Sequence, residues 1–171
     1  MKFTELLVAF GIISLVCVSA SGFINYMEEM RLKSAAFRVY SMFIEARNIA
    51  LRNNCYCGVV IEEKDNGHYL TVVKDCNFNG VIFKDYISGR DKEVSRGFLI
   101  EKEYPGVILK GIAFSSKHVI SFSPDMKSSS GSLYLSTKNP EDGLFKLTLY
   151  GSSFVVKPVK IFADGSKVKY E

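Results

Sequence analysis

The chain has 171 residues, a formal net charge of +4, and 13 Phe and 9 Tyr but no Trp. This length suits one ordinary domain with an appendage, and the aromatic side chains are sufficient for a substantial core. The mild charge argues against a protein that binds nucleic acid through a strongly basic surface, and equally against a chain with an acidic tail.

The first part of the chain, MKFTELLVAFGIISLVCVSASGF, begins an uncharged segment that no later segment matches in length. No charged residue occurs between Leu6 and Ile24. As a helix, these residues (about 19) span roughly 28 Å, close to the hydrocarbon thickness of a bilayer. Glu5 stands at the head of the segment. A carboxylate inside a membrane costs about 2.5–3.5 kcal/mol at mid-bilayer, and it normally marks a functional position.

A cleaved signal peptide is one interpretation of this segment. Lys2 supplies a thin positive region, and Val18-Ser19-Ala20 is a passable cleavage site of small residues. The mature protein would then be a secreted, soluble, β-rich protein freed by cleavage after Ala20. Glu5 fits this interpretation poorly, because it cancels Lys2. A lipoprotein with Cys17 as its lipidated residue is rejected, because no small residue directly precedes Cys17.

A retained membrane helix explains Glu5 better, provided that the carboxylate finds a cationic partner. The free N-terminal amine of a neighbouring helix of the same kind would serve. This interpretation predicts helices that leave the membrane and pack in a staggered bundle.

The segment Phe3-Thr4-Glu5-Leu6-Leu7-Val8 resembles the N-terminal signature of type IV pilins and pseudopilins, in which Phe-Thr, a Glu at mature position five and a Leu-rich helix recur. The resemblance implies a prepilin peptidase/methyltransferase as a partner and Glu5 and Met1 as assembly residues. It also implies a filament core that includes Leu6, Leu7, Phe10 and Ile13. The sequence departs from the pattern in two ways: Met1, with no leader before it, replaces the usual Phe, and Gly22 replaces a common Pro.

The helical pattern continues past the apolar segment. Apolar residues recur at alternating spacings of three and four, which places them on one side of a helix. They are Leu32, Ala36, Val39, Phe43, Ala46 and Ala50. Asn53-Asn54 suits a C-terminal cap. We therefore predict one long helix, apolar all round over residues 1–25 and amphipathic over residues 26–54, with its apolar stripe packed on a sheet.

From Cys55 onward the apolar period becomes two. Val59 and Ile61 precede Asp65-Asn66-Gly67-His68, and Leu70 and Val72 follow it. Asn-Gly is the strongest short signal for a hairpin, so two paired strands are expected here.

Three of the four cysteines lie near this hairpin. With Asn66-Gly67 as the two turn residues, Cys57 faces Cys76 across the strands, near enough for a disulfide. Such a bond is expected outside the cytoplasm. Cys55 is then left over, or it replaces Cys57 if the register slips.

Short strands are expected through the rest of the chain, punctuated by Gly, Pro, Ser and Asn. They lie near residues 81–86, 93–100, 107–109, 118–122, 132–136, 145–150, 154–158 and 168–170. One helix followed by many short strands predicts an α+β fold with antiparallel β-sheets over residues 55–171. A filament-core half-helix, residues 1–25, would precede a globular domain of residues 26–171.

Later segments extend the resemblance to the GspH/FimT-type minor pseudopilins. Residues 46–54 resemble their helix end, and residues 75–80 resemble their Asp-x-Asn-x-x-Gly turn. Residues 119–124 resemble their I-x-F-x-P strand, and residues 131–135 stand where the family has Gly-Thr and a strand. The resemblance implies a long helix on two antiparallel sheets. It also implies a non-enzymatic subunit of a type II secretion pseudopilus or a type IV pilus. Such a subunit crosses the inner membrane once, with a periplasmic globular domain, and then assembles with other pilins.

Asp75, Asn77 and Asn79 also match the first half of a calcium loop. The twelfth position is Tyr86, however, and not Glu. A polar turn is the preferred interpretation, since Asn and Gly accept positive φ. We expect no metal and no cofactor, and the sequence has no nucleophile elbow, phosphate loop or telling pair of carboxylates, so an enzyme is not expected.

The C-terminal stretch is basic through Lys157, Lys160, Lys167 and Lys169. Some pilin-like proteins of this family bind DNA through such a region, which makes a DNA-binding minor pilin for uptake an alternative. Asp164 and Glu171 dilute the charge and the stretch has no Arg, so a solvated strand face is the favoured interpretation.

Overall fold

The computed structural model describes residues 3–138, 143–151, 155–162 and 164–169; within them, the side chains of residues 3–6, 9, 15–22, 24–25 and 155–157 are not described. The fold is α+β, a long N-terminal helix packed on antiparallel sheets, as the sequence predicts.

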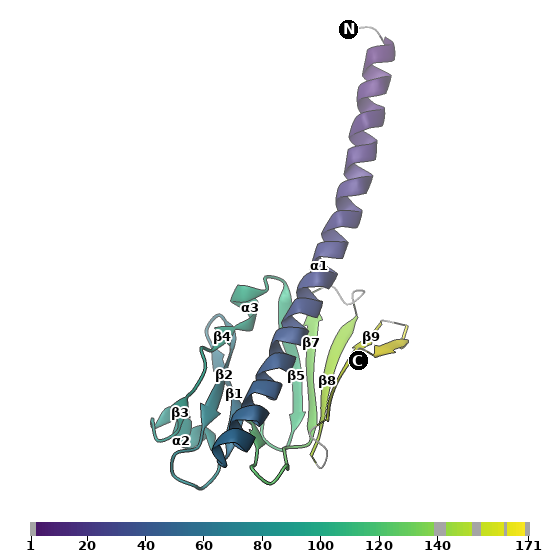
Figure 1. The fold of residues 1–171 in the computed structure, drawn as a ribbon. Helices are drawn as coiled ribbons and strands as arrows, with labels where there is room; N and C mark the ends of the chain where they lie inside the picture. Colours follow the sequence, from purple (N-terminus) through teal and green to yellow (C-terminus); the bar gives the residue numbers. More distant parts are fainter. Residues whose placement is uncertain (1–2, 139–142, 152–154, 163, 170–171) are drawn as a thin grey trace.

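Helix α1 (Phe3–Asn53) runs without a break, lying across the sheets with its second half and projecting beyond them with its first (Figure 1). All six residues of the predicted apolar stripe are fully buried, and Ala35 and Met42 join them. The helix ends as expected from Asn53-Asn54. Asn54 adopts a φ of 47°, and the Cys55 N–H donates to the Ala50 carbonyl at 3.2 Å. This is the bond of a Schellman cap, which satisfies an otherwise orphaned carbonyl.

The first sheet is built on the predicted hairpin. Its strands are β1 (Cys57–Lys64), β2 (Gly67–Lys74), β3 (Lys92–Glu93), β4 (Phe98–Leu99) and β6 (Val119–Phe122). Their order is β3-β2-β1-β6, and β4 also pairs with β2. The short helices α2 (Phe83–Ile87) and α3 (Ile100–Glu103) connect strands of this sheet and the next.

The predicted hairpin register is wrong by two residues. Lys64 pairs with Gly67, so the turn is Asp65-Asn66, and Gly67, with a φ of 129°, begins β2. Cys57 therefore lies opposite Lys74 and not opposite Cys76. A shift of two residues leaves every side chain on the same face of the sheet, which is why the apolar pattern could not exclude it.

The second sheet contains β5 (Val107–Phe114), β7 (Gly131–Thr137), β8 (Leu144–Tyr150), β9 (Val155–Ile161) and β10 (Lys167–Lys169). Their order is β10-β9-β8-β7-β5, with antiparallel pairing throughout. Side chains of α1 and of both sheets form a single apolar cluster. At its centre the rings of Phe43 and Phe122 lie 6.3 Å apart.

Two predicted strands differ in the structure. The segment 81–86 forms α2, where the Asp85 and Tyr86 N–H groups donate to the Ile82 carbonyl at 3.0 and 3.1 Å. Its backbone bonds are therefore made locally, not to a neighbouring strand. The segment 93–100 contributes only the short strands β3 and β4.

We expect Phe43→Ala to lower the free energy of unfolding by about 3–5 kcal/mol, because the ring is fully buried between the helix and the sheets. The control is Phe78→Ala, because Phe78 is 85% exposed. Urea unfolding of the purified full chain measures both variants. Equal losses from the two would contradict this account of the core.

Candidate functional site

The projecting part of α1 exposes apolar side chains. Among the predicted filament-core residues, Leu7, Phe10 and Ile13 are 56%, 62% and 58% exposed. Val8 and Ile12 are also exposed, so the apolar surface continues around the helix. A contiguous exposed apolar surface of this kind marks a site of contact with a membrane or another protein.

Three residues predicted to act here are not described in full. Met1 lies outside the described residues, and the side chains of Glu5 and Leu6 lie outside the described side chains. Within the described part of the chain, no helix is both long enough and apolar enough to cross a membrane.

An ion pair fastens strand β9 to helix α1. The Lys160 ammonium donates to a Glu29 carboxylate oxygen, and it also lies 4.6 Å from the centre of the Phe162 ring. The side chain of Lys160 is only 3% exposed, whereas that of Glu29 is 48% exposed. The pair joins residues 131 positions apart in the sequence, so it adds a link between the second sheet and the helix.

One of the four lysines named as possible DNA contacts does not lie on the solvated strand face that the sequence favours. Lys160 is buried and paired, and is therefore unavailable to a phosphate. Lys167 and Lys169 are exposed on β10, and the side chain of Lys157 lies outside the described side chains. Lys160 therefore does not share the exposed surface of Lys167 and Lys169.

We expect Glu29→Gln to lower the free energy of unfolding by about 1–3 kcal/mol, because it leaves the buried Lys160 ammonium without its carboxylate. The matched control is Asp125→Asn, which removes the carboxylate partner of the exposed Lys127. An exposed pair contributes little, so the control should be close to wild type. Chemical denaturation compares them, and a control as damaging as Glu29→Gln would refute the role given to the Lys160 pair.

Asp75 organises the loop that follows β2. One carboxylate oxygen accepts the N–H groups of Asn77 and Phe78, both at 2.9 Å, and the other accepts the Gly80 N–H at 2.8 Å. These bonds hold Phe78 at a φ of 64°. Asp75 therefore stabilises this tight turn by accepting hydrogen bonds from its backbone N–H groups.

Two further buried carboxylates complete this loop. Asp85 accepts the side-chain amides of Asn79 at 2.8 Å and Asn77 at 3.1 Å, and these bonds, Asn79 first, hold the pKa of Asp85 below its usual range. Asp91 accepts the Cys76 N–H at 3.3 Å, while burial raises the pKa of Asp91. Among the described residues, no group of His, Cys, Asp and Glu side chains is arranged to hold a metal ion. The oxygens are bonded to the loop itself, in the geometry of a polar turn.

We expect the melting temperature of the chain to be the same in millimolar calcium and in chelator, because the oxygens of Asp75 and Asp85 are already hydrogen-bonded to the loop. Asp75→Asn should lower the melting temperature in both conditions, because an amide can accept at only one of its two positions. Thermal unfolding in both buffers measures this. A clear rise of the wild-type melting temperature with calcium would contradict it.

The predicted pairing of Cys57 with Cys76 is not found. In this structure no disulfide joins Cys55, Cys57 or Cys76, and Cys57 lies opposite Lys74. Burial raises the pKa of Cys57 to about 12, so it remains a protonated thiol within the core.

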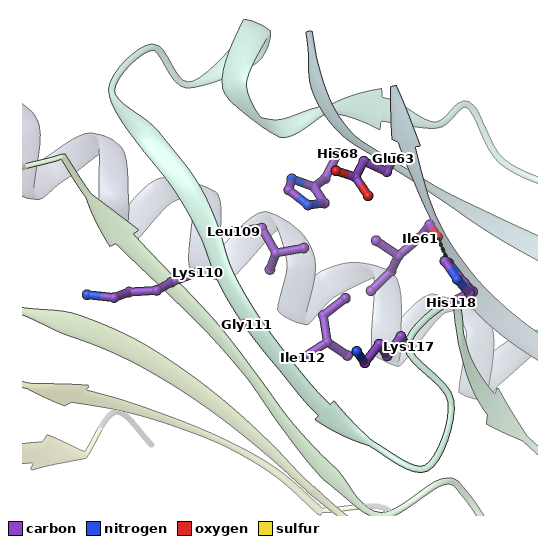
Figure 2. Close-up of a pocket in the computed structure, with 9 residues that line it drawn as sticks. All are labelled: Ile61, Glu63, His68, Leu109, Lys110, Gly111, Ile112, Lys117 and His118. Atoms are coloured by element: carbon purple, nitrogen blue, oxygen red, sulfur yellow. Dashed lines mark hydrogen bonds between the residues drawn. The ribbon is translucent and has the colours of Figure 1, made fainter. Parts of the chain in front are cut away.

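A groove of about 380 Å³ lies between the neighbouring edges of the two sheets, beside β1 and β5 (Figure 2). Ile61, Leu109 and Ile112 form its apolar floor, and Figure 2 shows their side chains pointing toward one another. The groove is rimmed by polar and charged side chains: Glu63, His68, Lys110, Lys117 and His118. The sequence did not reveal this groove, because it arises where two separate sheets meet and no local pattern marks that meeting.

Both histidines at the groove are held by neighbouring groups. The ring of His68 bonds to Glu101 at 2.8 Å, and the His68 N–H donates to the same carboxylate at 2.7 Å. The ring of His118 stacks on Phe83 with centroids 4.4 Å apart. The Ser116 hydroxyl accepts the backbone N–H groups of His118 and Val119. These contacts fix the ends of strands, and they do not assemble a nucleophile with its base.

Comparison with known proteins relates this architecture to solved structures. No protein-family model matches the chain, and no curated protein sequence matches it. The minor pseudopilin EpsH from the type 2 secretion system of Vibrio cholerae is similar in structure, with a TM-score of 0.50 over 82% of this chain and 96% of EpsH, at 12% identity. The chain has a pilin-like fold.

The type IV minor pilin FimU of Pseudomonas aeruginosa is a second similar structure. Two crystal forms give TM-scores of 0.49 and 0.47, at 15% and 16% identity. They cover 85% and 82% of this chain, and 92% and 93% of FimU. At such identities the likeness concerns the arrangement of helix and sheets and extends to no particular site residue.

Proposed function

We propose that this pilin-like chain is a minor pilin or pseudopilin subunit, which assembles through α1 into a type II secretion pseudopilus or a type IV pilus. One observation carries the proposal: a single helix is buried in the globular core at one end and exposes apolar side chains at the other. Such a helix needs a non-aqueous partner along its projecting part. The role is structural and non-enzymatic.

The proposed organisation follows from this division of the helix. Residues 1–25 form a half-helix that crosses the inner membrane once before assembly and lies in the filament core afterwards. Residues 26–171 form the periplasmic globular domain, with helix 26–54 packed on the sheets of residues 55–171. Other pilins then replace lipid around the half-helix. A prepilin peptidase/methyltransferase would prepare the N-terminus.

The two alternatives are less well supported. Cleavage after Ala20 would release a soluble protein, but it gives no role to Glu5 and cuts within an unbroken helix. DNA uptake would need an exposed basic surface, and Lys160 is buried in its pair with Glu29. Cleavage after Ala20 would also remove the exposed apolar residues Leu7, Phe10 and Ile13.

Glu5 supplies the selectivity of assembly in this proposal. Its carboxylate would meet the N-terminal amine of a neighbouring subunit among packed apolar helices, where little water screens the two charges. Removing one of the two charges leaves the other buried without a partner, which costs on the order of 3–5 kcal/mol. That is sufficient to decide which subunit enters a growing filament.

We expect the Glu5→Ala protein to remain in the membrane with a folded globular domain, but to be absent from filaments. Glu5→Asp should enter in reduced amounts, because its shorter side chain reaches less far. The control is Glu28→Ala, which removes a carboxylate from the same helix outside the apolar segment. Fractionation of cells into sheared filaments and membranes measures all three.

If Glu5 merely tolerates the membrane, Glu5→Ala should instead improve retention and leave filament entry unchanged, since it removes a charge from lipid. Normal amounts of this variant in the filament fraction would remove Glu5 from the assembly mechanism.

A further inference from the structure

The cysteines offer a second feature, which is independent of filament assembly. The β1–β2 ladder extends past its last assigned pair, Cys57 and Lys74, because the Asp75 N–H donates to the Tyr56 carbonyl at 3.0 Å. Continuing the same register by one more residue on each strand places Cys55 opposite Cys76.

We infer that Cys55 and Cys76 form a disulfide that closes the base of the β1–β2 hairpin. Hydrogen-bonded and non-hydrogen-bonded pairs alternate along an antiparallel ladder. Tyr56 and Asp75 are a hydrogen-bonded pair, so Cys55 and Cys76 occupy a non-hydrogen-bonded position. Opposed Cα atoms there lie about 4.5 Å apart, within the span of about 4.4–6.8 Å that a disulfide bridges.

The backbone bonds of the two cysteines agree with this position. The Cys55 N–H donates to the Ala50 carbonyl in the helix cap, and the Cys76 N–H donates to Asp91. Neither N–H is directed across the ladder to the other cysteine, as a non-hydrogen-bonded pair requires. Extending the alternation of side chains beyond each strand places both cysteines on the same face as Cys57 and Val72.

The two thiols differ in access, which sets the order of the reaction. Cys76 is exposed and its thiol donates only a weak bond of 3.6 Å to the Lys74 carbonyl, while Cys55 is buried. Burial raises the pKa of the Cys55 thiol. The Cys76 thiolate therefore attacks first, on a small-molecule or protein disulfide, and releases one thiol.

Cys55 then loses its proton and attacks the Cys76 sulfur of the mixed disulfide. This forms the Cys55–Cys76 bond and releases the second thiol. Two cysteine thiols are oxidised and one disulfide of the oxidant is reduced to two thiols. The product ties the end of α1 to the loop that Asp75 and Asp91 organise.

Cys57 is excluded from the pair by its place in the ladder. It is fully buried and lies opposite Lys74, beyond the intervening pair of Tyr56 and Asp75. This makes Cys57→Ala a matched control, because it changes a neighbouring cysteine on the same face of the same strand.

The test oxidises the full chain in detergent with oxidised glutathione, then alkylates free thiols and maps peptides without reduction. All proteins carry Cys17→Ala, which prevents crosslinks between copies through that residue. We expect a Cys55–Cys76 linked peptide in this background and in Cys57→Ala, and none in Cys55→Ser or Cys76→Ser. Reduction should lower the melting temperature of the first two proteins and leave the last two unchanged.

Two results would overturn the inference. One is alkylation or separate glutathionylation of Cys55 and Cys76 under conditions that oxidise a control dithiol. The other is a linked peptide that contains Cys57. The outcome is separate from that of the Glu5 experiment, because the disulfide forms within one chain whether or not the chain enters a filament.

Discussion

The packing of the second half of α1 against both sheets is the contact on which the globular part depends. Among the described strands, each sheet pairs only within itself, and no ladder joins one to the other. The apolar stripe of the helix meets residues of both sheets in one cluster. Four of its buried residues are alanines, which let the helix backbone approach the strands closely: Ala35, Ala36, Ala46 and Ala50.

The packing of both sheets on one helix has two consequences. The first is that the sheets separate on the side away from the helix, where the groove opens over Ile61 and Leu109. The second is that one continuous helix serves both the core and the projecting segment. Its buried stripe contacts both sheets, and the Glu29–Lys160 pair links it to the second sheet. In the proposed filament, this helix joins the globular domain to the filament core.

The elements that depend on local sequence patterns could be predicted from the sequence. The stripe from Leu32 to Ala50 and the cap at Asn54 follow helical spacing and backbone preference, and both are confirmed. The hairpin was found from Asn66-Gly67, yet its register was missed, because a two-residue shift keeps the same face buried. The resemblance to pseudopilins gave the correct fold class through the order of several weak motifs.

The features that depend on contacts between residues far apart in the sequence could not be predicted from it. Lys160 looked like one of several surface lysines, since its partner Glu29 lies 131 residues earlier. The segment 81–86 has the apolar and aromatic residues of a strand, but its backbone bonds are made locally to the Ile82 carbonyl in α2. The groove depends on the spacing of two sheets, which no single segment encodes.

The central claim is that the projecting half of α1 is kept in the working protein, and the intact mass of the chain isolated from cell envelopes tests it most directly. The account predicts a mature chain that retains residues 3–20 and carries a methylated N-terminal amine. A mass corresponding to a chain that begins at Ser21 would contradict it, because the exposed apolar turns and Glu5 would then have been removed before the protein acted.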